Sequence, residues 1–130
     1  MKIKILKYLK IFLILVALHS FFVGLGLIFL PLEFLKFWGF EGYQGIFFKI
    51  QGGVFHIVMC GAYLPAAINP SRNRILILFA IFAKFTATLF LISYAWFIEM
   101  VWMVMASGFI DFLMAVILLF FYKRLQSELE

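Results

Sequence analysis

Four side chains that can carry a charge or pass on a proton lie deep inside long apolar stretches of this sequence. They are His19, His56, Lys84 and Asp111. Such groups are costly in an apolar interior, and there they mark proton or ion relays, polar binding pockets or buried ion pairs. The structural alternative is that Lys84 and Asp111 neutralise one another and that the histidines are hydrogen-bonded to hydroxyls or carbonyls. The sequence leaves both interpretations open.

His56 belongs to a stretch that sets several polar groups into an otherwise apolar segment. At about 100° per residue, Gly52, His56 and Tyr63 fall on one narrow stripe of a helix, and this stripe is expected to face protein. Gln51, Tyr63 and Thr88 are candidates to satisfy the hydrogen bonds of the histidines and charges. The complete candidate site comprises His19, Gln51, His56, Tyr63, Lys84, Thr88 and Asp111.

Two histidines on different helices would also allow a haem with two imidazole ligands, His19 and His56. The chain has no Cys-x-x-Cys-His attachment motif and no basic residue beside the histidines to bind haem propionates. Zinc would need both histidines and Asp111 as ligands, with Lys84 turned away. The single Cys60 excludes an intramolecular disulfide and a cysteine-based metal cage. We therefore expect no bound cofactor or metal, with haem as the alternative.

The elements that carry these residues are predicted from composition. Hydrophobic residues make up 67% of the 130-residue chain and charged residues 13%, with a mean hydropathy of +1.15. A soluble protein of this size could not bury so much apolar surface, and each apolar run is about 20 residues long, enough to cross a bilayer. We predict an all-α polytopic membrane protein, a single domain with a bundle of four transmembrane helices. The predicted spans are residues 11–30, 46–68, 75–98 and 101–122.

An outer interfacial segment is predicted at residues 32–45, between the first two spans. It mixes aromatic residues with three charges and three glycines, so it is too short and too polar to cross the membrane. Pro31 separates it from the first span. Trp38 and Tyr43 are expected at headgroup level. The segment forms either an interfacial helix or re-entrant turn, or a plain loop with aromatic anchors.

The basic residues predict how the chain lies in the membrane. Eight of the eleven lysines and arginines fall in the N-terminal arm, the 69–74 loop and the C-terminal end, three places that share one side in a four-span chain. By the positive-inside rule, both termini are cytoplasmic, and the interfacial segment and the Glu99 turn are on the outer side. The net charge of +5 therefore reflects topology and not nucleic-acid binding.

Lys84 and Asp111 are predicted to form an ion pair across the hairpin of the third and fourth spans. They lie fourteen residues before and thirteen residues after residue 98, close to the predicted turn, so an antiparallel hairpin puts them at similar depth. Small residues on the same helix faces, such as Ala80 and Gly108, allow the two helices to approach closely.

Two short motifs resemble a known type of membrane protein. Gly-Leu-Gly-Leu-Ile-Phe-Leu-Pro at 24–31 closes the first span, and Gln-Gly-Gly-Val-Phe-His at 51–56 lies in the second, followed by two spans that carry charges. Over its whole length the chain resembles the small bacterial four-helix membrane proteins of the DoxX-like and BphX-like type. Some of these are encoded beside redox or catabolic enzymes. The resemblance implies an accessory component of the bacterial inner membrane and carries over no catalytic residue.

The sequence contains no nucleophile elbow, phosphate loop or pair of acid and base carboxylates, which favours a role other than catalysis without deciding it. The first functional hypothesis is an accessory or scaffold protein whose midplane polar network specifies packing, within a larger membrane complex or a homo-oligomer. The second is proton-coupled transport or binding of a small apolar or amphipathic molecule, with Asp111 and His56 as titrating groups. The third is a redox component that binds haem or a quinone between the first two helices.

Overall fold

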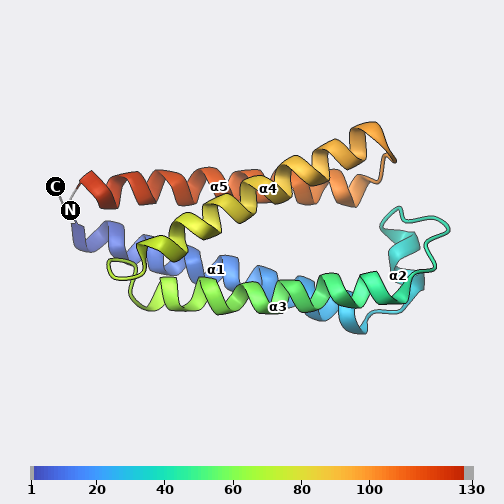
Figure 1. Ribbon diagram of the computed structural model, residues 1–130, viewed down its shortest axis with the longest axis horizontal. Helices are drawn as coiled ribbons and strands as arrows, with labels where there is room; N and C mark the ends of the chain where they lie inside the picture. The colour runs from blue at the N-terminus through green and yellow to red at the C-terminus, as the bar shows by residue number, and fades with distance from the viewer. Residues whose placement is uncertain (1, 128–130) are drawn as a thin grey trace.

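The computed structural model describes residues 2–127, and these form five α-helices and no strands (Figure 1). Four of the helices are long and apolar enough to cross a membrane, which agrees with the predicted all-α fold of four spans. The fifth is a short helix that follows the first span. The helices are α1 (Lys2–Phe29), α2 (Leu32–Phe37), α3 (Ile46–Ile68), α4 (Arg74–Phe97) and α5 (Trp102–Ser127).

The boundaries of the central helices follow the turn signals of the sequence. Helix α3 has the predicted bounds, because the Asn69-Pro70 turn ends it, and α4 begins one residue earlier than expected. The outer ends differ more. Helix α1 extends back through the basic N-terminal arm and α5 continues beyond residue 122, because lysine, arginine and leucine are good helix formers and do not stop a helix.

The segment predicted as interfacial contains both a helix and a loop. Helix α2 covers its first six residues, and the chain then turns back without regular structure until α3 begins. Gly39 permits this turn, because its φ of +95° is unfavourable for other residues and an added Cβ would lie 3.0 Å from the Trp102 side chain. Phe40 packs beside Val101, so the loop after α2 contacts the start of α5.

The four long helices form two tightly packed pairs. Helix α1 packs along α3 to form the first pair, and α4 packs along α5 to form the second. In the first pair the backbones touch, since a Cβ added to Gly53 would lie 2.7 Å from the carbonyl oxygen of Gly24. In the second pair a Cβ added to Gly108 would lie 2.9 Å from the Ile92 side chain. Glycine therefore allows the close approach in both pairs.

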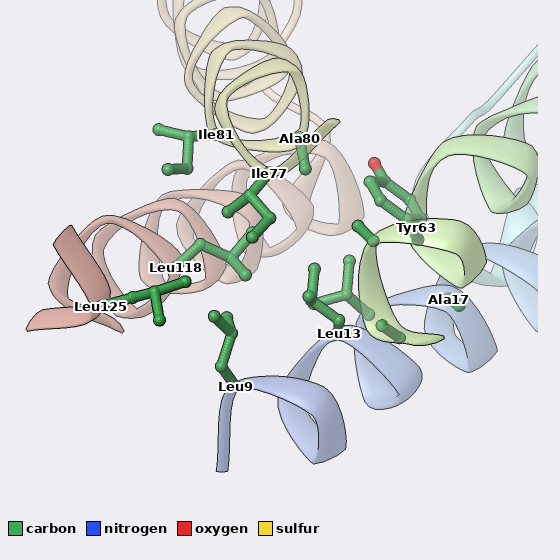
Figure 2. Packing of buried hydrophobic residues seen from close by; sticks show 12 residues of the cluster. Leu9, Leu13, Ala17, Tyr63, Ile77, Ala80, Ile81, Leu118 and Leu125 are labelled. Carbon is green, nitrogen blue, oxygen red and sulfur yellow. The ribbon is translucent and has the colours of Figure 1, made fainter. Parts of the chain in front are cut away.

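The two pairs meet at one end of the molecule and diverge toward the other. The start of α1, the α3–α4 connection and the end of α5 lie at the end where the pairs meet, and α2 and the α4–α5 turn lie at the opposite end (Figure 1). Apolar side chains from all four long helices fill the meeting point (Figure 2), and we call this cluster the basal core. It consists of Leu9, Leu13, Val16, Ala17, Tyr63, Ala66, Ala67, Ile77, Ala80, Ile81, Leu118 and Leu125.

Candidate functional site

A cavity of about 600 Å³ lies between the two helix pairs, beyond the basal core. Every described helix contributes to its lining, and so does the loop after α2, which closes part of it from the far end. Most of the lining side chains are apolar or aromatic, with a few polar groups among them. The lining residues are His19, Phe22, Val23, Gly26, Leu27, Leu30, Leu35, Trp38, Phe40, Tyr43, Lys49, His56, Leu91, Met103, Val104, Ser107 and Asp111.

The predicted ion pair between the third and fourth spans is confirmed. The Lys84 ammonium lies 2.5 Å from Oδ1 of Asp111, and the two residues are 3% and 7% exposed. Thr88 supports the pair, because its hydroxyl donates to the Lys84 carbonyl at 2.9 Å and lies 3.3 Å from the carbonyl of Gly108 on the neighbouring helix. Each charge is thus balanced inside the second helix pair, as a buried charge requires.

Tyr63 connects the ion pair to the first helix pair. Its ring, on α3, lies 6.0 Å from the Lys84 ammonium, a distance typical of a cation–π contact. The Tyr63 side chain is buried in the basal core. The sequence placed Tyr63 in the polar site for its hydroxyl, whereas the structure brings its aromatic ring to the lysine.

His56 is hydrogen-bonded to a residue that the sequence did not single out. Oγ of Ser20, on α1, lies 3.1 Å from Nδ1 of His56 and donates to the His56 carbonyl at 3.0 Å. Ser20 thus contacts both the imidazole and the backbone carbonyl of His56, and its role at Nδ1 depends on the tautomer of His56. Ser20 is fully buried next to His19, and a hydroxyl at that place in an apolar run was the available signal.

His19 differs from His56, although both line the cavity. Its Nδ1 atom is buried and has no hydrogen-bond partner within residues 2–127. The residues proposed to satisfy it do not do so: Thr88 is bonded to backbone carbonyls, and Gln51 is exposed on α3 and lies outside the cavity lining. Cys60 packs inside the first helix pair, where its thiol is buried against the Ala17 carbonyl.

Lys49 is a lining residue that the sequence reasoning missed. It lies in the first turn of α3, is 8% exposed, and donates from its ammonium to the Leu27 carbonyl at 2.6 Å. The available signal was its position, because Lys36, Lys49 and Lys84 are the basic residues outside the three clusters that define topology. The structure thereby adds a basic group to the cavity of the histidines, where the sequence suggested none.

Trp38 and Tyr43, expected at headgroup level, also line the cavity. They come from the loop after α2 and are half-buried. Trp38, Phe40 and Tyr43 therefore face the space between the helix pairs, where the fold of the loop around Gly39 brings them.

The donor set fits neither zinc nor a haem between the histidines. Within residues 2–127 no group of three His, Cys, Asp or Glu side chains is arranged to hold a metal ion, and Asp111 is already paired with Lys84. A porphyrin between two imidazoles would need the helices that carry them to stand apart. Helices α1 and α3 instead touch through Gly24 and Gly53, close to both histidines.

Apolar walls that carry a few hydrogen-bonding groups are typical of cavities that bind small molecules with an apolar body. The resemblance to the DoxX-like and BphX-like proteins rests on the arrangement of four spans and on the motifs at 24–31 and 51–56. No family model matches the chain, and no curated protein or solved structure is similar enough to it to count as a match.

Proposed function

We propose that this chain is a membrane protein that binds a small amphipathic molecule in the cavity between its two helix pairs. The observation that carries the proposal is the cavity itself, with a volume of about 600 Å³, largely apolar walls and an unpartnered imidazole nitrogen among its lining residues. Ligand sites in proteins have volumes of roughly 300–1,000 Å³ and combine apolar walls with a few polar groups that orient the ligand.

His19 is the residue assigned to contact the polar part of the ligand. A buried polar atom without a hydrogen bond costs about 1–3 kcal/mol, so a ligand that hydrogen-bonds to the His19 imidazole would recover this energy. His56 and Asp111 already have internal partners in Ser20 and Lys84. His19, in contrast, has an imidazole nitrogen without an internal partner.

The basal core supports binding over proton-coupled transport. Leu9, Leu13, Ile77 and Leu118 are completely buried where the helix pairs meet, so one end of the cavity is closed by tightly packed side chains. Transport would require this packing to separate in every cycle, whereas binding requires no such change. A quinone, proposed from the sequence as a redox ligand, belongs to the class of molecules that such a cavity would take.

We place the protein in the bacterial inner membrane, with both termini in the cytoplasm and the cavity in the outer half of the bilayer. The distribution of charge supports this orientation, because Lys4, Lys7, Lys10, Arg72 and Lys123 belong to elements at the basal end. Positively charged residues favour the cytoplasmic side of a bacterial membrane. Aromatic and aliphatic side chains are exposed along all four long helices, where the lipid bilayer would surround them.

A second candidate function is an accessory or scaffold role in a larger membrane complex or a homo-oligomer. The internally balanced Lys84–Asp111 pair favours it, because such a pair can specify how helices pack without taking part in chemistry. The two roles differ in what the purified protein carries, a small molecule in one and a protein partner in the other.

Native mass spectrometry of the protein, purified in mild detergent from its source membrane, tests the proposal. The Gly26→Leu variant fills the cavity, because a Cβ at Gly26 would meet only Leu30, at 3.4 Å. Gly61→Leu is the matched control, since Gly61 is exposed and has no atom within 4 Å of an added Cβ. A small-molecule adduct is expected on the wild type and on Gly61→Leu, and it should be lost from Gly26→Leu.

A wild-type protein without a small-molecule adduct, or an adduct that persists in Gly26→Leu, would contradict the cavity as the binding site. A protein partner in place of the adduct would favour the scaffold role. An absorption spectrum of the same preparation tests the haem alternative, since a Soret band that disappears in both His19→Ala and His56→Ala would replace the present proposal with a haem protein.

A further inference from the structure

Lys49 is a buried positive charge without a balancing negative charge. Its side chain lies among the cavity-lining residues, and it is 8% exposed. Within residues 2–127 the one ion pair is that of Lys84 and Asp111. The carboxylates nearest in sequence, Glu33 and Glu41, are exposed and make no ion pair with Lys49. The first turn of α3 therefore brings a full positive charge to the cavity wall.

The hydrogen bond that Lys49 makes compensates its positive charge only in part. Its acceptor is the carbonyl of Leu27, in the last turn of α1, where backbone carbonyls have no partner within the helix. The end of a helix carries about half a negative elementary charge, which is less than the charge of an ammonium. An ammonium also has three donors, and this bond uses one of them. Two N–H groups and a net positive charge remain.

The position of Lys49 relative to the histidines defines the shape of a ligand. Lys49 and His56 both line the cavity, and they are seven residues apart on α3, or about 10 Å along the helix axis. Apolar side chains such as Leu27 and Val104 complete the wall. The cavity thus presents a cation near the start of α3 and a hydrogen-bonding imidazole two helical turns further along.

We infer that the ligand is an amphipathic anion whose carboxylate or phosphate binds Lys49, while its largely apolar body extends along the cavity and brings a second polar group to His19. This inference rests on the proposed function and adds the charge of the ligand to it. A purely structural role for Lys49 as the cap of α1 would need neither its burial nor its place in the cavity. A lysine this close to a helix end could instead extend toward the membrane surface.

Equilibrium binding to the protein in phosphatidylcholine nanodiscs tests this inference, with empty nanodiscs as the blank. The probes share one alkyl chain and differ in the head group: decanoate, decyl phosphate, decanol and decyltrimethylammonium. Decanoate or decyl phosphate should bind at least about tenfold more tightly than decanol, because hydrogen bonds to charged groups are worth that much. The tighter of the two anions identifies the head group.

Variants of Lys49 and of a control lysine show whether Lys49 itself recognises the charge of the ligand. Lys49→Met should bind the anions no more tightly than decanol, and Lys49→Arg should keep the preference for anions. Lys36→Met is the matched control, because Lys36 is exposed on α2 at the same end of the molecule, and it should behave as the wild type.

Two kinds of result would overturn the inference, and only the second would also overturn the proposed function. If the wild type binds decanol as tightly as the anions, or if Lys49→Met keeps the preference for anions, Lys49 does not recognise an anion but the cavity still binds amphipathic molecules. If no probe binds the wild type above the empty nanodiscs, the proposed function fails as well. The wild-type comparison decides the matter even if Lys49→Met does not fold.

Discussion

The two helix pairs both bury polar residues but satisfy their hydrogen bonds and charges to different extents. In the second pair, Lys84 and Asp111 neutralise each other, and Thr88 bonds the carbonyls of both helices. In the first pair, His56 is bonded to Ser20, whereas His19 has an unpartnered nitrogen and Lys49 has no counter-charge. The comparison teaches that polarity in a membrane helix does not by itself indicate a ligand site. We propose that the residues left without a hydrogen-bond partner or a counter-charge mark the ligand site.

Breaking the ion pair is expected to have the largest effect on stability. Lys84→Met or Asp111→Leu leaves one buried charge unpaired and should lower the free energy of unfolding by about 3–5 kcal/mol, whereas the double variant should recover much of the loss. Chemical unfolding in detergent micelles measures both. A double variant that loses the sum of the two single effects would show that the pair is not an independent unit.

Disrupting the glycine contact in the first helix pair should have the second-largest effect on stability. Gly53→Leu would push a side chain into the Gly24 backbone, and it should cost about 1–3 kcal/mol, the usual cost of overpacking. Gly61→Leu, on the same helix but in open space, should unfold as the wild type does. Equal stability of the two variants in the same unfolding experiment would mean that α1 and α3 do not depend on this close approach.

The smallest expected effect distinguishes the two histidines. Ser20→Ala removes the partner of His56 and should lower the free energy of unfolding by about 1 kcal/mol. His19→Leu removes a buried nitrogen that has no partner, so in ligand-free protein its stability should equal or exceed that of the wild type. Clear destabilisation by His19→Leu would mean that His19 has an internal role, and the contrast between the helix pairs would no longer hold.

The sequence predicted the arrangement of polar residues in the second helix pair but not in the first. Lys84 and Asp111 are joined by one short turn, so counting residues on either side of residue 98 is enough to place them at equal depth. His19 and His56 are separated by Pro31, α2 and an irregular loop, so no such count relates them. Whether Gln51 can contact the histidines depends on how α3 is rotated, which the sequence does not predict. In the structure this residue is exposed.

The sequence by itself determined the number of spans, the ends that are set by a turn and the ion pair, because these depend on local quantities. Apolar length sets each span, Pro31 and Asn69-Pro70 end two of them, and helical rise from a tight turn sets the depth of Lys84. Only the tertiary structure decided that the helix pairs diverge around a cavity and that Lys49 and His19 line it. These features depend on how two pairs rotate and cross, which is set by non-local contacts such as the one between Gly24 and Gly53. No local pattern in the sequence predicts how the two helix pairs rotate against each other.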